Sequence, residues 1–150
     1  MNDLGALEAY AANLLASLEP GARADLAKRL ASALRASQQR RIAAQQNPDG
    51  TAYAPRKPQL RKKIGSVRRQ MFAKLRTARY LKAGGSADAA LVAFTADVSR
   101  VARVHQFGLR DRVNRAGLEV AYQERQLLGL SEADEALIRD LCLAQLAERL

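Results

Sequence analysis

The segment that decides how this 150-residue chain folds is QQNPDGTAYAPRKPQLRKK, residues 45–63. Helical periodicity runs into Asn47-Pro48-Asp49-Gly50, where the proline cannot extend a helix and the glycine accepts a positive φ. Three of the four prolines lie in this segment, and each disfavours the α conformation of the residue before it. We therefore expect a long helix to end at this turn and an irregular, extended, basic loop to cover about residues 47–65.

The sequence before this segment predicts two helices. Apolar residues recur at helical spacing over about residues 3–18, and Glu19-Pro20-Gly21 ends the pattern. Pro20 suits the first position of a second helix that runs to about residue 46, because its missing N–H has no helical partner there. The first apolar stripe comprises Leu4, Leu7, Tyr10, Ala11, Leu14, Leu15 and Leu18, and the second comprises Leu26, Leu30, Leu34 and Ile42.

The sequence after the loop predicts shorter elements. They are a helix over about 66–79, a flexible break at Gly84-Gly85-Ser86, a strand in AALVAF (89–94), a short helix near 98–105 that Gly108 terminates, a charged loop at 109–116, a strand near 118–122, and a last helix that begins with a capping box at Ser131. This order predicts a helix-rich α+β fold with long N-terminal helices, a small antiparallel sheet and a C-terminal helix. We expect residues 1–150 to form a single domain.

The charge of the chain is concentrated in its centre. Hydrophobic residues make up 48% of the sequence, as in folded proteins. The formal net charge is +10, and residues 35–82 hold fourteen Lys and Arg with one acid, whereas residues 1–34 and 83–150 are close to neutral. A small domain needs a net charge of only about 2–8 for solubility. We therefore expect the central segment to contact an anion or an acidic protein surface.

The residue inventory argues against catalysis. His105 is the only histidine and Cys142 the only cysteine, which excludes a histidine metal cluster, a Cys-rich zinc site and a disulfide within one subunit. No nucleophile elbow, phosphate loop or dinucleotide fingerprint is present. We expect no enzymatic activity, no cofactor, a packed or hydrogen-bonded His105, and a Cys142 that is buried as a small hydrophobe.

The sequence also predicts where the protein is made. No stretch approaches the roughly 18 apolar residues of a membrane span. Residues 1–18 carry Asp3 and Glu8 at helical spacing, unlike a signal peptide. We therefore expect synthesis in a cytoplasm and no membrane partner.

Two interpretations of the basic segment remain open: a solvated charged surface without function, or a contact surface. The residues expected to contact a partner or DNA are Arg56, Lys57, Arg61, Lys62 and Lys63 in the loop, with Arg68, Arg69, Arg76 and Arg79 on an adjoining helix face. Only three aromatic residues lie in the segment, and no helix-turn-helix pattern appears, so base stacking and base reading are poorly supported. Nucleic acid, if bound, would be bound for its charge.

Four short segments occur in an order that resembles one protein family. They are RRIAAQQNPDGTAYAPRK (40–57), MFAKLRTARYLKA (71–83), VHQFGLRDRV (104–113) and ERQLLGLS (124–131). In this series the chain resembles, over nearly its whole length, the virion morphogenesis or tail completion family of contractile-tailed temperate phages. The residues that carry the resemblance are Pro48, Asp49, Gly50, Pro55, Arg56, Lys57, His105 and Gly108. The chain departs from the family pattern at Tyr53, where tryptophan is as common, and at Gln123-Glu124, where a Pro-Ala pair is common.

The resemblance implies a structural role. Such proteins act late in assembly, at the head-proximal end of the tail or in the neck, and make the tail competent to join the filled head. The implied partners are copies of the chain in a ring, often sixfold, the tail tube or terminator, the head connector and, as a nonspecific contact, packaged DNA. The implied location is the neck or tail of the virion, after assembly in the host cytoplasm. The rival interpretation is a sequence-nonspecific nucleic-acid-binding protein.

Overall fold

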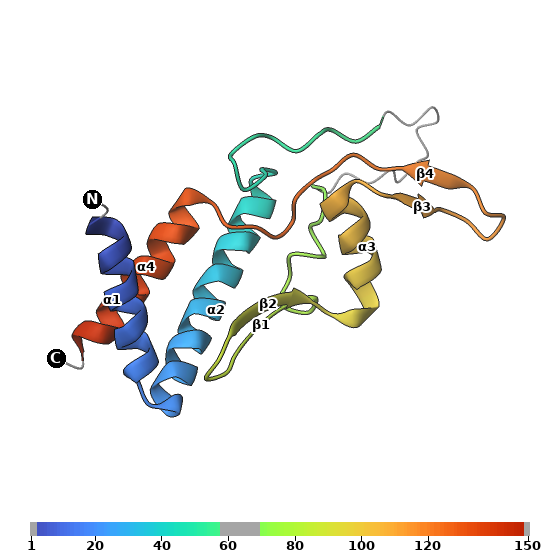
Figure 1. Cartoon of the computed structure of the whole chain (residues 1–150). Coiled ribbons are helices and arrows are strands. Elements are labelled where there is room, and N and C mark those ends of the chain that lie inside the picture. The colour runs from blue at the N-terminus through green and yellow to red at the C-terminus, as the bar shows by residue number, and fades with distance from the viewer. Residues whose placement is uncertain (1–2, 58–69, 149–150) are drawn as a thin grey trace. The chain divides into compact units, whose positions relative to one another are not determined.

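The computed structural model describes residues 3–57 and 70–148 (Figure 1). The chain forms two compact units, which we describe separately. The first comprises Met1–Arg35, Ala83–Val92 and Glu132–Leu150, and the second comprises Ala36–Lys82 and Ala93–Ser131. The expected helix-rich α+β class is confirmed, with the four strands forming two separate two-stranded sheets instead of one sheet. That residues 1–150 act as a single domain stays a prediction.

The first unit is built mainly from helices. Helix α1 spans Asp3–Ser17, α2 begins at Pro20 and ends at Ala43, and α4 spans Glu132–Ala147. These bounds confirm the predicted first, second and last helices, except that α2 ends before residue 46. Helix α1 contacts α4, and the small core beside them contains Leu18, Ala22 and Leu146 with Leu14 and Leu15 packed against it.

The apolar stripe expected along α1 is buried only in its second half. Leu18 is 8% exposed, whereas Leu4, Leu7 and Tyr10 are 75%, 61% and 62% exposed. The first turns of α1 therefore carry large apolar side chains that nothing in the described part of this unit covers. An apolar patch of this kind usually marks an interaction surface.

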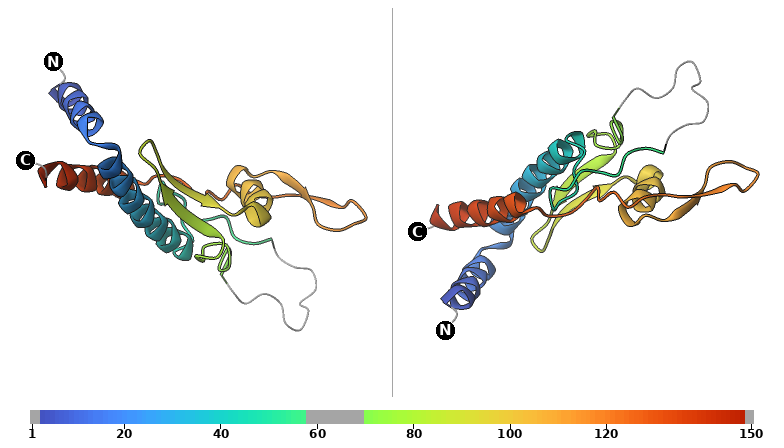
Figure 2. Two further views of the ribbon diagram at one scale, coloured as in Figure 1. Left: turned by 90° about the horizontal axis from the view of Figure 1, so that it is seen from below. Right: turned by 90° about the horizontal axis from the view of Figure 1, so that it is seen from above.

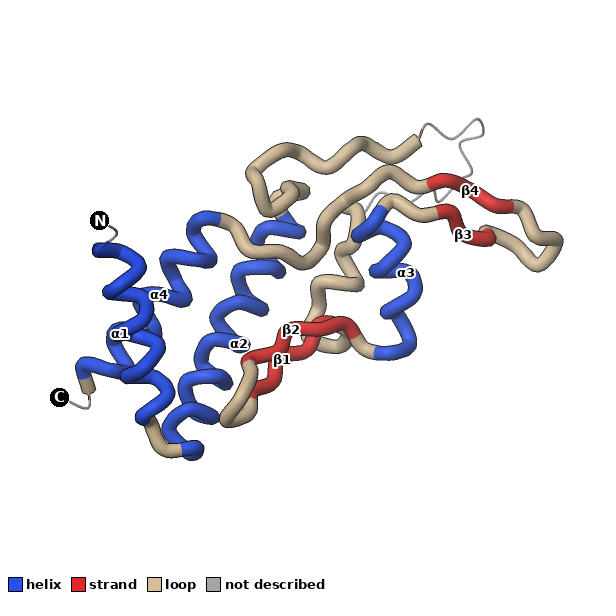
Figure 3. Tube along the Cα trace, in the orientation of Figure 1, coloured by secondary structure: helices blue, strands red, loops and turns tan. Residues whose placement is uncertain are grey.

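A β-hairpin follows the turns that end near residue 80 (Figure 3). Strand β1 spans Leu81–Gly85 and β2 spans Ala90–Phe94, so the predicted strand at 89–94 is confirmed. The predicted flexible break is wrong at Gly84 and Gly85, which belong to β1. Gly85 lies so close to α2 that a Cβ there would be 2.6 Å from the backbone nitrogen of Lys28. The glycine therefore permits close packing of a strand on a helix, which the sequence alone did not distinguish from flexibility.

The second unit contains α3 and a short second hairpin that extends beyond it (Figure 2). Helix α3 spans Ala96–Phe107, as predicted, and Gly108 ends it in the left-handed region at φ 62°. Strands β3 (Arg110–Arg112) and β4 (Glu119–Ala121) pair antiparallel, with Asp111 opposite Val120. The strand predicted near 118–122 is confirmed, but the loop predicted at 109–116 is wrong at 110–112. A charged segment pairs here because its partner strand follows after a tight turn, in which Gly117 has φ 87°.

The helix predicted over 66–79 is not formed in its described part. Residues 66–69 lie outside the described residues, and residues 71–80 form a series of turns. Phe72 has φ 65°, a left-handed conformation that interrupts an α-helix. Met71, Phe72 and Leu75 instead pack against the core of the second unit, so tertiary burial outweighs the helical periodicity of this segment.

The core of the second unit joins segments that are far apart in the sequence. Ile42 of α2, Tyr53, Ala102 of α3 and Leu127 form its buried centre. Ile42 and Leu127 are fully buried, and Tyr53 is 5% exposed. The segment around Tyr53, predicted to be part of an extended loop, is therefore anchored in the core.

Candidate assembly site

The end of α2 sets the geometry of the family-like turn. Gln45 has φ 57°, its N–H donates to the carbonyl of Ile42 at 2.9 Å, and the N–H of Gln46 donates to the carbonyl of Arg41 at 3.2 Å. This pair of bonds is the Schellman pattern that closes a helix, with Gln45 in the place usually held by glycine. The helix therefore ends before Asn47, and the expectation that Asn47-Pro48-Asp49-Gly50 itself ends it is wrong.

Asn47-Pro48-Asp49-Gly50 instead forms the tip of a short hairpin. Gln46 and Ala52 form an isolated antiparallel bridge, and the N–H of Asn47 donates to the carbonyl of Thr51 at 2.8 Å. Gly50 has φ 87°, as the turn chemistry predicted. The Asp49 carboxylate accepts hydrogen bonds from the Thr51 hydroxyl and backbone N–H, and these lower the pKa of Asp49.

Arg41, near the end of α2, connects this turn to the 124–131 segment. Its Nη1 donates to the carbonyls of Gln46 and Gln126 at 3.0 and 2.9 Å, and its Nη2 donates to the carbonyl of Leu127 at 2.8 Å. The Tyr53 hydroxyl donates to the same Gln126 carbonyl at 2.9 Å. One guanidinium thus satisfies backbone acceptors from two segments that lie about eighty residues apart in sequence.

Two amide side chains, the buried Gln38 and the half-buried Gln106, complete this connection. The Gln106 Oε1 accepts the N–H groups of Leu127 and Leu128, both at 2.9 Å, and the Gln38 Oε1 accepts the N–H of Gly129 at 3.1 Å. A Cβ on Gly129 would lie 2.5 Å from Cγ of Pro48, so the proline of the turn packs directly on this glycine. The segment 124–129 is therefore fixed to the second unit by side chains rather than by a sheet.

Arg125 holds the chain that follows Tyr53. Its Nε donates to the carbonyl of Ala54 at 2.7 Å and its Nη2 to the carbonyl of Pro55 at 2.9 Å, with 5% of the residue exposed. Burial, together with the nearby charge of Arg56, lowers the pKa of Arg125. Lys57 continues the anchoring, because its Nζ donates to the carbonyl of Ala121 at 3.0 Å.

His105 and Gly108 support Arg125 from α3. The carbonyl of His105 accepts the N–H of Arg125 at 2.8 Å. A Cβ on Gly108 would lie 2.9 Å from the backbone nitrogen of Glu124, so only glycine allows this approach. The His105 ring meets the rings of Phe72 and Tyr122 edge to face, each with centroids 4.9 Å apart. Burial and the charge of Arg125 lower the pKa of His105, partly opposed by Asp111, so the imidazole is neutral at pH 7.

A pocket of about 590 Å³ opens beside His105 in the second unit. Its lining residues are Arg56, Lys57, Met71, Phe72, His105, Val120, Ala121, Tyr122, Gln123 and Arg125. Most of them are apolar or aromatic and three are cationic, with no acid among them. We refer to this hollow as the cationic pocket. Its chemistry suits a ligand that carries both an anionic and an apolar group.

Comparison with known proteins decides the family. A model of the phage virion morphogenesis family matches residues 2–147. The chain belongs to the phage virion morphogenesis family. It is similar to tail completion protein S of Escherichia phage P2, with 44% identity over 148 residues that cover 97% of this chain and 99% of that protein. No solved structure matches.

The structure brings together several of the residues that carry the resemblance to the virion morphogenesis family. Pro48 packs on Gly129, Pro55 accepts a bond from Arg125, and His105 and Gly108 support Arg125 from α3. Asp49 and Gly50 shape the tip of the turn.

The predicted basic contact residues divide into three groups. Arg56 and Lys57 are exposed at the cationic pocket. Arg76 and Arg79 lie in the turns at 71–80 instead of on the expected helix face, and the Arg79 guanidinium lies 5.2 Å from the centre of the Tyr80 ring. The remaining five, Arg61, Lys62, Lys63, Arg68 and Arg69, lie outside the described residues.

Sequence reasoning missed the residues that organise this member of the virion morphogenesis family. Arg41 and Arg125 look like ordinary surface arginines in the sequence, because a charge run gives no sign that a guanidinium is directed at backbone carbonyls. Gln38 and Gln106 gave no signal either. The one available hint was Tyr53, at a position where the family often has tryptophan, since a large aromatic ring in a loop is typical of an anchor in the core.

No group of three or more His, Cys, Asp or Glu in the described ranges could hold a metal ion. None of the helices within residues 3–57 and 70–148 is long and apolar enough to span a membrane. Cys142 is half-buried instead of fully buried, and burial raises the pKa of its thiol.

Proposed function

We propose that this protein is a non-enzymatic component of a tailed phage virion that completes the head-proximal end of the tail or the neck, and so enables the tail to join the head. The observation that carries the proposal is the 44% identity to tail completion protein S of Escherichia phage P2 over 97% of this chain. Because the alignment spans 99% of that protein as well, it includes both units of the fold rather than one shared module.

The structure supports a role through protein contacts. Buried side chains fix the family-like segments to one another, so these segments serve the architecture of the second unit. The sequence also contains a run of cations, since residues 50–87 contain eleven Lys and Arg and no Asp or Glu. We refer to nine of these cations as the basic strip: Arg56, Lys57, Arg61, Lys62, Lys63, Arg68, Arg69, Arg76 and Arg79.

In this proposal the basic strip docks on an acidic surface of the tail tube, the terminator or the head connector. Copies of the chain form a homo-oligomeric ring in the neck, which multiplies a weak contact by presenting it several times. The protein assembles in the host cytoplasm and remains in the virion. Contact between the basic strip and packaged DNA is secondary.

Genetic complementation tests the proposal. A phage that lacks this gene is supplied with the wild-type chain or with Arg61→Glu, Lys62→Glu and Lys63→Glu together. We expect the triple variant to fold but to give the plaque count of the deletion, while filled heads and separate tails accumulate in electron micrographs. Normal virion yield from this variant would exclude docking through the basic strip.

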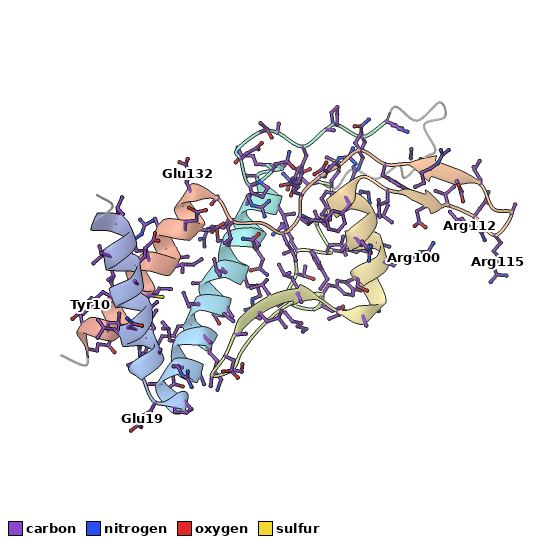
Figure 4. All side chains as sticks on the ribbon, in the orientation of Figure 1. Tyr10, Glu19, Arg100, Arg112, Arg115 and Glu132 are labelled. Atoms are coloured by element: carbon purple, nitrogen blue, oxygen red, sulfur yellow. The ribbon has the colours of Figure 1, made fainter. Side chains whose placement is uncertain are left out.

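The matched control makes the same change of net charge elsewhere. Arg103, Arg112 and Arg115 are exposed on α3 and the β3–β4 hairpin, and the last two are labelled in Figure 4. Their combined replacement by Glu is expected to leave virion yield close to wild type. Equal failure of both triple variants would show that net charge matters rather than this surface.

A second candidate function is sequence-nonspecific binding of nucleic acid. The observation that favours it is the charge of residues 35–82, with fourteen Lys and Arg and one acid. Each phosphate contact releases a counterion, so the affinity for duplex DNA should fall steeply as salt rises. Fluorescence anisotropy with a labelled duplex measures this slope, and the Arg61→Glu, Lys62→Glu, Lys63→Glu variant should reduce it. Under this candidate the same variant loses DNA binding but keeps any oligomer intact.

A further inference from the structure

The first turns of α1 form an acidic and apolar surface that the fold leaves uncovered. Leu4 and Leu7 are three residues apart and therefore share one side of the helix, and Tyr10, labelled in Figure 4, follows at the next turn. All three are exposed, as is Glu8. Helix α1 contains two acids and no Lys or Arg. We refer to Leu4, Leu7, Glu8 and Tyr10 as the α1 face.

The cationic pocket has the complementary character. Its wall includes the side chains of Met71, Phe72 and Val120, which are half-buried and apolar. Its cations are Arg56, Lys57 and Arg125. A volume of about 590 Å³ is enough for several side chains of a partner.

The described lining of the pocket contains three cations. Burial is the main cause that lowers the pKa of Arg125, and the nearby charge of Arg56 adds to it, so two like charges lie close together. No acid is among the described residues that line the pocket, and residues 50–87 contain none in sequence. A carboxylate that entered would meet cations on the pocket wall and would relieve this repulsion.

We propose that the α1 face of one copy docks in the cationic pocket of a second copy. The inference deepens the proposed function, on which it rests, by naming the contact that joins neighbouring subunits. Leu4 and Leu7 enter the apolar part of the pocket, and Glu8 approaches Arg56 and Lys57. The mode is that of an amphipathic helix laid in a groove, with anchors three to four residues apart.

This contact joins two different surfaces and is therefore heterologous. Each copy offers one α1 face and one cationic pocket, so an open assembly of any length still has one free α1 face at one end and one free pocket at the other. Such contacts continue from copy to copy and close into a ring when the rotation between neighbours allows. A contact of α1 with α1 would instead stop at a dimer.

The apolar content of the pocket favours a protein segment over a nucleic-acid backbone. A duplex presents phosphates but no apolar group that would fill the space beside Phe72 and Val120. The α1 face offers both an acid and large apolar side chains, in the same chain and at equal stoichiometry. Duplex DNA as the occupant is an outcome that the test distinguishes.

Sedimentation velocity of the full chain, over concentrations from low micromolar to near millimolar, tests the contact. We expect the wild-type chain to form species above its 16.4 kDa monomer. Two variants are expected to be monomeric: the face variant Leu4→Gln, Leu7→Gln and the pocket variant Arg56→Glu, Lys57→Glu. The contact would bury both leucines of the α1 face, so their replacement should weaken association roughly a hundredfold.

Both variants should fold, because they replace exposed side chains, and circular dichroism checks this. The control for the face variant is Leu91→Gln with Leu143→Gln, at leucines that are 61% and 52% exposed. The control for the pocket variant is Arg112→Glu with Arg115→Glu on the exposed hairpin. Both controls are expected to associate like the wild-type chain.

An equimolar mixture of the two variants gives the decisive result. The face variant keeps its pocket and the pocket variant keeps its α1 face, so each mixed pair can form one contact and no more. We expect a one-to-one heterodimer that does not grow with concentration.

Four outcomes would overturn the inference. They are a wild-type chain that stays monomeric throughout, a variant that still associates, a control that associates as weakly as its variant, and a mixture that stays monomeric. Association of the wild-type chain only when duplex DNA is added would assign the pocket to nucleic acid instead. None of these outcomes depends on the plaque count of the complementation test, so the two proposals can fail separately.

Discussion

The second unit contains two pairs of cations with the same charge but different roles in the fold. One pair is Arg41 and Arg125, and the other is Arg56 and Lys57. The first pair directs its guanidinium groups at backbone carbonyls of Gln126, Leu127, Ala54 and Pro55. The second pair is exposed beside the cationic pocket, where Lys57 makes a single exposed bond to the carbonyl of Ala121. The difference shows that part of the positive charge of this chain satisfies backbone carbonyls, and we propose that another part contacts partners.

Net charge alone cannot separate these purposes. A guanidinium has five N–H donors in a fixed fork, so it can satisfy several carbonyls where no sheet or helix does. The segment 124–129 contains no strand or helix and needs such a donor. We infer that part of the basic excess is structural, and that mutational scans of the basic residues will yield two classes of phenotype.

The largest effect is expected from Arg41→Ala. The change removes hydrogen bonds to the carbonyls of Gln46, Gln126 and Leu127. The Gln126 carbonyl keeps its bond from Tyr53, whereas the carbonyl of the buried Leu127 loses its bond from Arg41. Bonds to a charged donor contribute about 1.5–3 kcal/mol each, and partial replacement by water reduces the sum. We expect a loss of about 3 kcal/mol in the free energy of unfolding, measured by urea titration.

Arg40→Ala is the matched control for this prediction. Arg40 precedes Arg41 on α2 and its side chain is exposed. Its replacement should change stability by no more than about 0.5 kcal/mol. If Arg40→Ala and Arg41→Ala cost the same, the distinction between structural and contact arginines would be wrong at this site.

The second largest loss of stability is expected at Gly108, which lies against the backbone of Glu124 and so positions Arg125. In Gly108→Ala the new Cβ would meet the backbone nitrogen of Glu124, and alanine would also have to adopt φ 62°. A left-handed alanine alone costs about 1–2 kcal/mol. We expect a loss of about 2 kcal/mol and faster hydrogen exchange at the N–H of Arg125, which donates to His105.

Gly84→Ala separates this prediction from a general sensitivity to glycine replacement. Gly84 has open space where a Cβ would lie, and its φ is not positive. Alanine there should be neutral or slightly stabilising, because it reduces the freedom of the unfolded chain. If Gly84→Ala lowered the free energy of unfolding as much as Gly108→Ala, the explanation by steric contact with Glu124 would be wrong.

The sequence predicted the parts of the fold that depend on local signals. Apolar spacing located α1, α2 and α4, and Gly108 marked the end of α3, because periodicity and capping are properties of neighbouring residues. The turns at 71–80 were wrong for the opposite reason. Their apolar residues are periodic, but burial against Ile42 and Tyr53 holds Phe72 in a left-handed conformation.

The candidate site was predictable in composition but not in geometry. The turn at 47–50 and the exposure of Arg56 and Lys57 follow from proline, glycine and charge. The pocket does not, because Phe72, His105 and Tyr122 meet only after three separate segments have packed together. Long-range packing of this kind leaves no mark at any one place in a single sequence.

A smaller effect on stability is expected when His105 becomes protonated at lower pH, because its imidazole is partly buried. The folded-state pKa of His105 is lowered by burial and by Arg125, against the opposing charge of Asp111. The unfolded chain therefore binds the proton more readily, and stability is lost as pH falls from about 6.5, the unfolded value, toward the lower folded pKa. The urea midpoint should drop between pH 7.5 and 5.5 in the wild-type chain.

His105→Gln removes the titrating group and should flatten this pH dependence. The range ends at pH 5.5 so that carboxylates, whose pKa values lie near 4, contribute little. Between pH 7.5 and 5.5, the wild-type chain should lose less free energy of unfolding than Gly108→Ala loses. A pH dependence that is unchanged in His105→Gln would assign the titration to another group.

The smallest effect on stability is expected from Arg56→Glu with Lys57→Glu, although both residues lie beside Arg125. Their side chains are exposed, and the bond from Lys57 to the carbonyl of Ala121 can be replaced by water. The reversal also removes the repulsion between Arg56 and Arg125, which offsets the lost bond. We expect the free energy of unfolding to change by no more than about 0.5 kcal/mol in urea titration. A loss as large as that of Arg41→Ala would place Arg56 and Lys57 among the structural cations and would remove the basis for assigning them to partner contact.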